Sequence, residues 1–143
     1  LNADLKDLKN IANSLGLNSD YDWIEDLQTL LFVHLIEPKI SQIPICFIYD
    51  YPKEQSALAK IDGPIAHRFE LYINGIEIAN GYEEIQSADE YRDRFNNELY
   101  KRKMIEKKKL LVDEEFLRDI KAGLPNCSGV AIGIERLFSS ISL

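Results

Sequence analysis

The sequence is poor in the residues that build metal centres and disulfide frameworks. Its 143 residues include two cysteines and two histidines, and Cys46 and Cys127 form no CxxC pair. His34 and His67 stand alone, without the spacing of metal ligands. A zinc-stabilised or disulfide-stabilised fold is therefore not expected, and a reducing, cytoplasmic compartment is predicted.

Long apolar runs and an excess of positive charge are also missing. No apolar run approaches the roughly 20 residues that a membrane span needs, so no membrane partner is expected. The net charge of −7 and pI of about 4.9 argue against nucleic-acid binding by bulk electrostatics. A Walker A loop, a GxGxxG motif, a signal-peptide pattern and an initial methionine are absent as well.

The helical pattern is clear in four places. Apolar spacing predicts one helix over residues 3–15. A second helix is predicted from about residue 19 or 20 to Ile36, ending before Pro38, with its C-terminal half buried. A third helix follows the capping box that begins at Ser87, and a fourth runs from the cap Asp113 to about residue 122.

The strand pattern indicates an antiparallel sheet. Residues 43–51 form a short apolar run rich in aromatic side chains, and residues 128–133 have strand character before a last helical segment. Asn74-Gly75 lies between two alternating runs and is a strong hairpin signal, because both central residues of a type I′ turn need φ > 0. With 45% apolar residues, the chain is predicted to form one α+β domain in which helices flank the sheet.

The hairpin "FELYINGIEIANGYEE" (69–84) carries four carboxylates. A regular register from the two-residue turn pairs Tyr72 with Glu77 and Glu70 with Ala79. The alternate face, which includes Phe69, Leu71, Ile73, Ile76 and Ile78, is then the expected core face. Glu70 and Glu77 become diagonal neighbours about 7–8 Å apart. They either share a divalent cation or are two solvated acids on an outward face.

In the second half of the hairpin, the polar side chains fall on the positions that should face the core. In a regular strand, Asn80, Tyr82 and Glu84 would point into the core, which would bury a carboxylate without a visible partner. Gly81 favours a bulge, because glycine inside a strand often marks one. We therefore expect a bulge over 79–81 that returns these three side chains to the polar face.

A second informative segment is "GLPNCSGVAIGIERLF" (123–138). Its small residues, including Gly129 and Ala131, allow another group to approach the backbone closely. Arg136 falls in the first turn of the expected last helix, where the helix dipole disfavours a cation. It either meets a phosphate or pairs with an acid such as Glu135 or one across the sheet.

Together these segments resemble class II lysyl-tRNA synthetases and their shorter paralogs, the ligases that attach β-lysine to elongation factor P. The resemblance is carried by "RFELYINGIEIANGYEEI" (68–85), by "GVAIGIER" (129–136), which is similar to class II motif 3, and by "FIYDYPKEQSALAKI" (47–61). It covers the chain from about residue 30 to the end. It implies a class II synthetase-like antiparallel sheet.

The resemblance also implies roles for individual residues. Glu70 and Glu77 would hold Mg²⁺ on the phosphates of ATP, with Asn80 assisting at the same site and at the amino acid. Arg136 would act in catalysis by stacking on the adenine or meeting the ATP phosphates. The amino-acid pocket would be formed by Tyr82, Glu84, which takes the substrate ammonium, Gly129 and Ala131.

The implied reaction is ATP-dependent activation of lysine or β-lysine as an adenylate. "CSGVA" (127–131), with a methyl group at Ala131, is closer to the ligases, whose acceptor is a lysine of elongation factor P. The alternatives are a lysyl-tRNA synthetase fragment acting on tRNA-Lys and a non-catalytic lysine-binding module. Motifs 1 and 2 are not found, so residues 1–143 are expected to be the C-terminal part of the catalytic domain, inactive alone. The complete protein is expected to be a homodimer.

Overall fold

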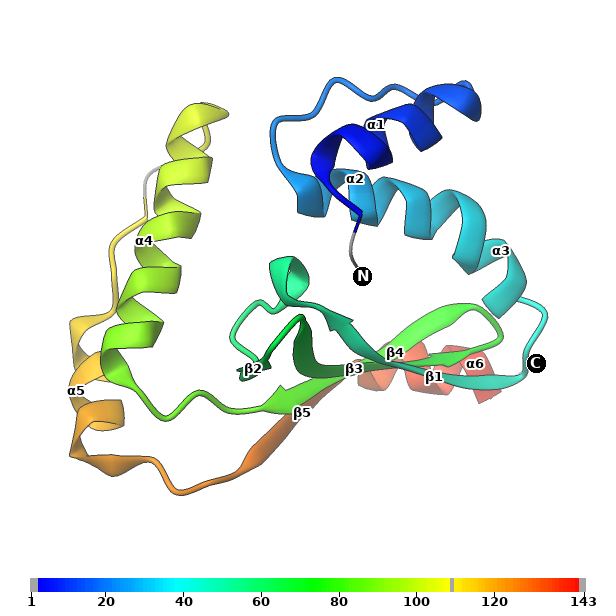
Figure 1. Ribbon diagram of the computed structural model, residues 1–143. Coiled ribbons are helices and arrows are strands. Elements are labelled where there is room, and N and C mark those ends of the chain that lie inside the picture. The colour runs from blue at the N-terminus through cyan, green and yellow to red at the C-terminus, as the bar shows by residue number, and fades with distance from the viewer. Residues whose placement is uncertain (1–2, 109, 142–143) are drawn as a thin grey trace.

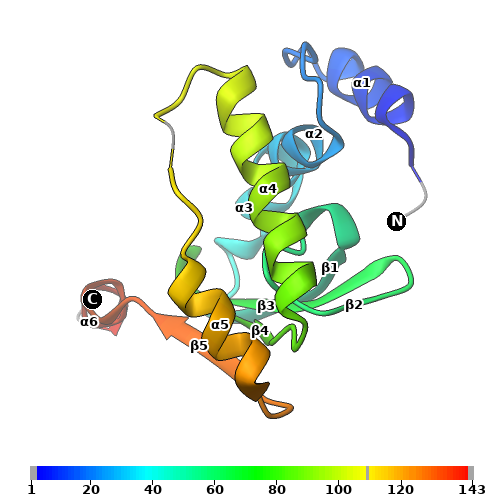
Figure 2. The same cartoon turned by 90° about the vertical axis from the view of Figure 1, so that its left-hand side faces the viewer.

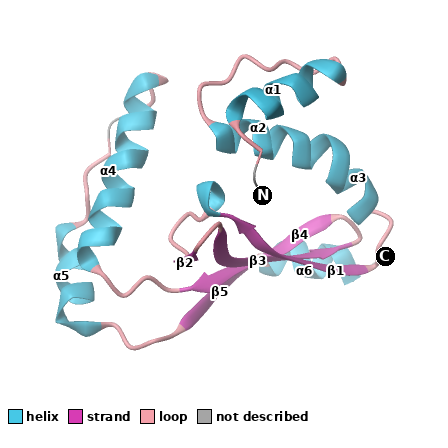
Figure 3. Cartoon of the chain, viewed as in Figure 1, coloured by secondary structure: helices cyan, strands magenta, loops and turns pink. Residues whose placement is uncertain are grey.

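An antiparallel sheet forms the centre of the molecule. The computed structural model describes residues 3–108 and 110–141 (Figure 1). The sheet order is β1-β3-β4-β5, every neighbouring pair is antiparallel, and the short β2 pairs with β3. The strands are β1 (Ile45–Pro52), β2 (Ile61–Asp62), β3 (Ile65–Ile73), β4 (Ile76–Glu83) and β5 (Ser128–Ile132). The α+β class with helices around an antiparallel sheet is confirmed (Figure 3).

The N-terminal helices lie on one side of the sheet. These are α1 (Leu5–Ser14) and α2 (Ile24–Leu31), and α2 continues through a π-helical turn, η1 (Phe32–Ile36), into α3 (Glu37–Ile40). The second helix was predicted to end before Pro38, which is wrong. Pro38 sits in the first turn of α3, where a missing N–H is tolerated. Burial of its C-terminal half was also overestimated, because Val33 and Leu35 are exposed.

The second helical layer joins the ends of β4 and β5. It consists of α4 (Ala88–Met104) and α5 (Glu114–Gly123), which pack side by side (Figure 2). Ser87 accepts a hydrogen bond from the Glu90 N–H and Asp113 caps α5, as predicted. The Glu90 carboxylate instead pairs with Arg94, so the capping box is only half formed. In the described part of the chain no helix is long and apolar enough to cross a membrane.

The hairpin turn forms as predicted, but the register beyond it does not. Asn74 and Gly75 have φ values of 50° and 79°, and Tyr72 lies opposite Glu77. The register then shifts, so that Leu71 opposes Ala79 and Glu70 opposes Asn80. The irregularity lies two residues before the predicted position. Its effect is the predicted one, because Asn80 now shares a face with Glu70.

The buried face of the hairpin was predicted correctly only in part, because Ile78 of the expected core face is 3% exposed but the polar face is buried as well. Glu70 and Tyr72 are 8% and 5% exposed, whereas Ile76 of the supposed core face is 40% exposed. The Phe32 ring of η1 packs over Tyr72, so the N-terminal helices cover the polar face. The opposite face meets α6 (Ile134–Ile141) along β4, and at the β1 edge it leaves Phe47 55% exposed.

Candidate functional site: a glutamate-centred face of the sheet

Glu70 on β3 is a buried carboxylate that accepts hydrogen bonds from four side chains. Its Oε2 accepts from the hydroxyls of Tyr51, at 2.6 Å, and Tyr72, at 2.7 Å. Its Oε1 accepts from Arg68 and, at 3.5 Å, from the amide of Asn80. Burial, together with the Glu70 carboxylate, raises the pKa of both tyrosines above the usual 10.0, so both remain hydrogen-bond donors.

Arg68 connects this carboxylate to its surroundings. It lies two residues before Glu70 on β3, so the period of the strand puts both side chains on one face. Its Nη1 donates to the Gln55 carbonyl at 3.1 Å and its Nε to Asn80 Oδ1 at 3.2 Å. The guanidinium also lies 4.5 Å from the centre of the Tyr51 ring. Arg68 therefore supplies the positive charge that a buried Glu70 needs.

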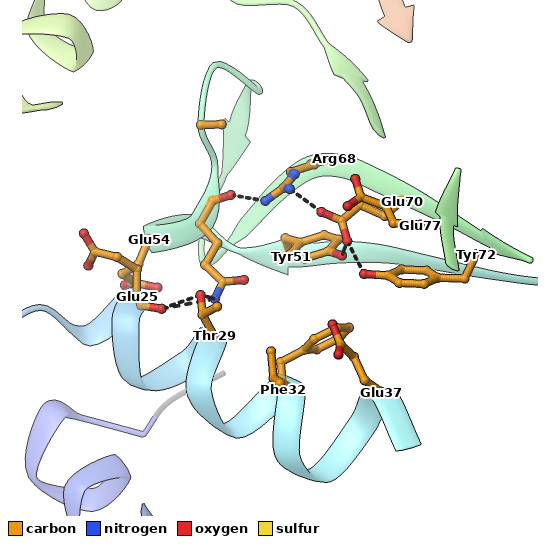
Figure 4. A pocket seen from close by; sticks show the side chains of 13 residues that line it. Glu25, Thr29, Phe32, Glu37, Tyr51, Glu54, Arg68, Glu70, Tyr72 and Glu77 are labelled. Carbon is orange, nitrogen blue, oxygen red and sulfur yellow. Dashed lines mark hydrogen bonds and ion pairs between the residues drawn. The ribbon is translucent and has the colours of Figure 1, made fainter. Parts of the chain in front are cut away.

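Glu70 and Glu77 line one pocket of about 410 Å³ between the hairpin and the N-terminal helices (Figure 4). Phe32 and Glu37 enter it from the helical side. Arg136 Nη1 lies 3.1 Å from the Glu77 carbonyl and 3.6 Å from its carboxylate. Arg136 therefore pairs with an acid on the sheet in this structure. The structure places Glu70 and Glu77 in one pocket, with Arg136 beside Glu77.

The donor set fits a magnesium ion that arrives with a nucleotide. Magnesium commonly takes one or two carboxylates from the protein and its other ligands from phosphates and water. Glu77 keeps only a 3.6 Å ion pair, and the 3.5 Å bond from Asn80 is the longest of the four on Glu70. No group of three or more acidic, histidine or cysteine side chains capable of holding a metal occurs within residues 3–108 and 110–141.

The predicted substrate residues occupy two adjacent rows across three strands. Asn80 is paired with Glu70 on one side and with Ala131 on the other. In the next row, Tyr82 is paired with Arg68 and with Gly129. Residues paired directly across strands present their side chains on the same face. The register therefore places Glu70, Asn80, Tyr82 and Ala131 on one surface.

Glu84 lies at the end of these rows and is half-buried. Its Oε2 accepts a hydrogen bond from the Tyr91 hydroxyl at 3.0 Å. Its Oε1 lies 2.7 Å from the point where a Cβ on Gly129 would stand. The carboxylate that the sequence left without a visible partner is thus held between α4 and β5.

The sequence interpretation missed Arg68, Tyr51, Tyr72 and Tyr91. Two of them had a usable signal, because "RFELY" (68–72) places an arginine and a tyrosine two residues on either side of Glu70. Tyr91 was recognised only as an apolar helix position. Its hydroxyl contact, like that of Tyr51, joins segments that no local pattern connects.

Comparison with known proteins agrees with this geometry. The family model described as "tRNA synthetases class II (D, K and N)" matches residues 10–142. Elongation factor P–(R)-β-lysine ligase from Vibrio cholerae is 43% identical over 96% of the chain, and the proteins of that name from Proteus mirabilis and Photobacterium profundum are 41% identical over 96%. The chain spans 44% of the length of each. It belongs to the class II tRNA synthetase family of the D, K and N type, as the resemblance predicted.

Proposed function

We propose that this chain forms the nucleotide- and amino-acid-binding part of a catalytic domain that activates lysine or β-lysine with ATP and transfers it to a lysine of elongation factor P. The observation that carries the proposal is the Glu84 carboxylate, held by Tyr91 beside Gly129 and adjacent to the Asn80 row. A half-buried anion at the end of a polar surface is suited to a substrate ammonium. The names of the similar proteins support the same acceptor.

The reaction would proceed in two steps. A carboxylate oxygen of the amino acid attacks the α-phosphorus of ATP, and the bond to pyrophosphate breaks. The ε-amine of the acceptor lysine then attacks the carbonyl carbon of the adenylate, AMP leaves, and the amine proton passes to solvent. Neither step needs a protein nucleophile, so the residues of the site act by binding and orientation.

Individual residues would divide this work. Mg²⁺ held by Glu70 and Glu77 would neutralise phosphate charge. Arg136, whose side chain is 61% exposed beside Glu77, would turn from that carboxylate to the nucleotide. Tyr82 and Ala131 would line the amino-acid pocket.

The setting of the complete protein is also proposed. A cytoplasmic location fits Cys46 and Cys127, which are both free thiols. A homodimer is proposed from the resemblance. The exposed apolar side chains Ile45 and Tyr49 on β1 provide surface for contacts with further protein.

The test is ATP–pyrophosphate exchange in a joined ligase, in which this chain replaces the matched segment of the Vibrio cholerae protein. Exchange with lysine and β-lysine is compared in the unaltered joined ligase, in Glu84→Gln and in the control Glu115→Gln, which changes an exposed glutamate of α5. Loss of a charge-assisted contact to the substrate predicts a decrease on the order of 100-fold in kcat/KM for Glu84→Gln alone.

The acceptor is tested with the same protein. Labelled amino acid is expected on elongation factor P and not on tRNA-Lys. Transfer to tRNA-Lys would contradict the proposed acceptor and favour a lysyl-tRNA synthetase. Lysine binding without exchange would favour a binding module, and an unchanged kcat/KM in Glu84→Gln would remove the proposed role of Glu84.

A further inference from the structure

Tyr91 is a core residue whose ring is buried and whose hydroxyl points toward Glu84. The residue is 2% exposed. Its ring meets Phe116 edge to face at 5.2 Å and Phe95 at 6.0 Å. Its hydroxyl donates to Glu84 Oε2 at 3.0 Å, and burial together with that carboxylate raises the pKa of Tyr91 above its usual value. The hydroxyl therefore stays protonated at neutral pH and donates to Glu84.

A phenylalanine would fill this cluster equally well. Burying a hydroxyl without a partner costs about 1–3 kcal/mol, so the tyrosine is favourable only because Glu84 accepts its hydrogen. The aromatic contacts account for an aromatic residue at position 91, and the hydrogen bond to Glu84 accounts for a tyrosine rather than a phenylalanine. Tyr91 thus belongs to the core by its ring and to the site by its hydroxyl.

Gly129 lies beside the same carboxylate. Its backbone is outside the left-handed region, so its conformation does not require glycine. The single neighbour that would be too close to an added Cβ is the Glu84 side chain, with Oε1 at 2.7 Å. Gly81 differs, because a Cβ there would meet the backbone oxygen of Gly129 and the Phe69 ring, each at 2.7 Å. Glycine at 129 therefore leaves space for the Glu84 carboxylate. Glycine at 81 is instead required by the close packing of β4 against β5 and Phe69.

Among the residues that the structure describes, one oxygen of Glu84 has no hydrogen-bond donor. Oε2 is occupied by Tyr91, and no hydrogen-bond donor reaches Oε1 among the residues that the structure describes. Oε1 lies over the backbone of β5, in the row that contains Tyr82. This is the oxygen available to a ligand.

We infer that Tyr91 and Gly129 are positioning residues that fix Glu84 in one orientation, with Oε1 presented to the side-chain ammonium of the substrate. The inference rests on the proposed function and adds what determines the strength of ammonium recognition. A carboxylate held in its bound orientation loses less conformational freedom when it binds, so affinity increases. The Tyr91 hydroxyl holds Oε2, and the missing side chain at Gly129 leaves space for Oε1.

The experiment measures KM and kcat for lysine and β-lysine in the joined ligase, with Tyr91→Phe and Gly129→Ala. Each variant is expected to raise KM about tenfold, corresponding to the loss of one hydrogen bond to a charged group or its orientation. The kcat and the KM for ATP are expected to stay within about twofold of the unaltered ligase. Any inhibition by norleucine, which lacks the side-chain ammonium, is expected to be equal in the variants and in the unaltered ligase.

Phe95→Leu is the matched control, because it disturbs the same aromatic cluster without a polar atom near Glu84. It is expected to lower the melting temperature and leave KM unchanged. Gly129→Ala is expected to show the reverse, a raised KM with an unchanged melting temperature, since only the end of a flexible side chain has to move.

The outcomes separate the two proposals. If Glu84→Gln leaves lysine use unchanged, or if the joined ligase binds no lysine, the proposed function fails and this inference fails with it. If Glu84→Gln impairs lysine use while Tyr91→Phe and Gly129→Ala keep the original KM, only the inference is overturned. A KM that rises equally in Phe95→Leu would also overturn it, because the effect would then be structural.

Discussion

The pair formed by Arg68 and Glu70 gives a quantitative test of the site. Both side chains are largely buried, at 16% and 10% exposure, and Arg68 also donates to the Gln55 carbonyl and to Asn80. Arg68→Met keeps an apolar stem of similar length and removes the charge and all the donors. Glu70 is then left as a buried anion without a cation.

The expected loss can be worked from these contacts. Removing one partner of a buried ion pair costs about 3–5 kcal/mol. The hydroxyls of Tyr51 and Tyr72 still donate to Glu70, so the lower end of that range applies. We expect the free energy of unfolding to fall by about 3 kcal/mol, a large part of the roughly 5–15 kcal/mol that stabilises a domain.

Urea unfolding followed by circular dichroism measures this change, and Arg92→Met is the matched control. Arg92 makes a two-pronged pair with Glu114 at 2.8 and 2.7 Å, but the side chains are 43% and 65% exposed. An exposed pair contributes at most about 1 kcal/mol. If Arg68→Met and Arg92→Met lowered the unfolding free energy equally, the assignment of Arg68 as the obligatory counterion of Glu70 would be refuted.

Two further predictions concern packing and pH. Gly81→Ala is expected to destabilise the protein by about 1–3 kcal/mol, because its Cβ would meet the Gly129 carbonyl at 2.7 Å; an unfolding midpoint unchanged by this substitution would contradict the β4–β5 register. Tyr51 and Tyr72 have folded pKa values raised above the usual 10.0, so above pH 10 the unfolded chain releases protons that the folded chain retains. The stability from each tyrosine is fully present below pH 10 and is lost above it, by up to about 1.4 kcal/mol per pH unit. Urea midpoints at pH 9, 10 and 11 are expected to fall less steeply in Tyr72→Phe, and an identical slope would count against the burial of that hydroxyl.

Much of the candidate site was accessible from the sequence because its motif residues lie close together in the chain. Glu70, Asn80 and Glu84 belong to one hairpin, and the turn at Asn74-Gly75 determines which strands pair. A bulge in this hairpin was predicted correctly, but it was placed at residues 79–81, two residues later than the observed irregularity between Glu77 and Ala79. A bulge relieves local strain in the paired strands, and glycine content alone does not say where that strain is greatest.

The buried face could not be derived from the hairpin. Alternation along β3 offered an apolar face and a polar face, and the polar one is covered, because Phe32 and the rest of the N-terminal helices pack over it. That polar face is stable under this cover only because Arg68, Tyr51 and Tyr72 satisfy the charge and oxygens of Glu70.

The sequence by itself determined the turn, the helix caps at Ser87 and Asp113, the antiparallel class and the family motifs, since each depends on neighbours within a few residues. Only the tertiary structure decided how the acids are neutralised. Arg136 reaches Glu77 from the last helix, and Tyr91 reaches Glu84 from α4. A side-chain contact between distant segments depends on how those segments pack, and packing depends on the whole core rather than on any local pattern.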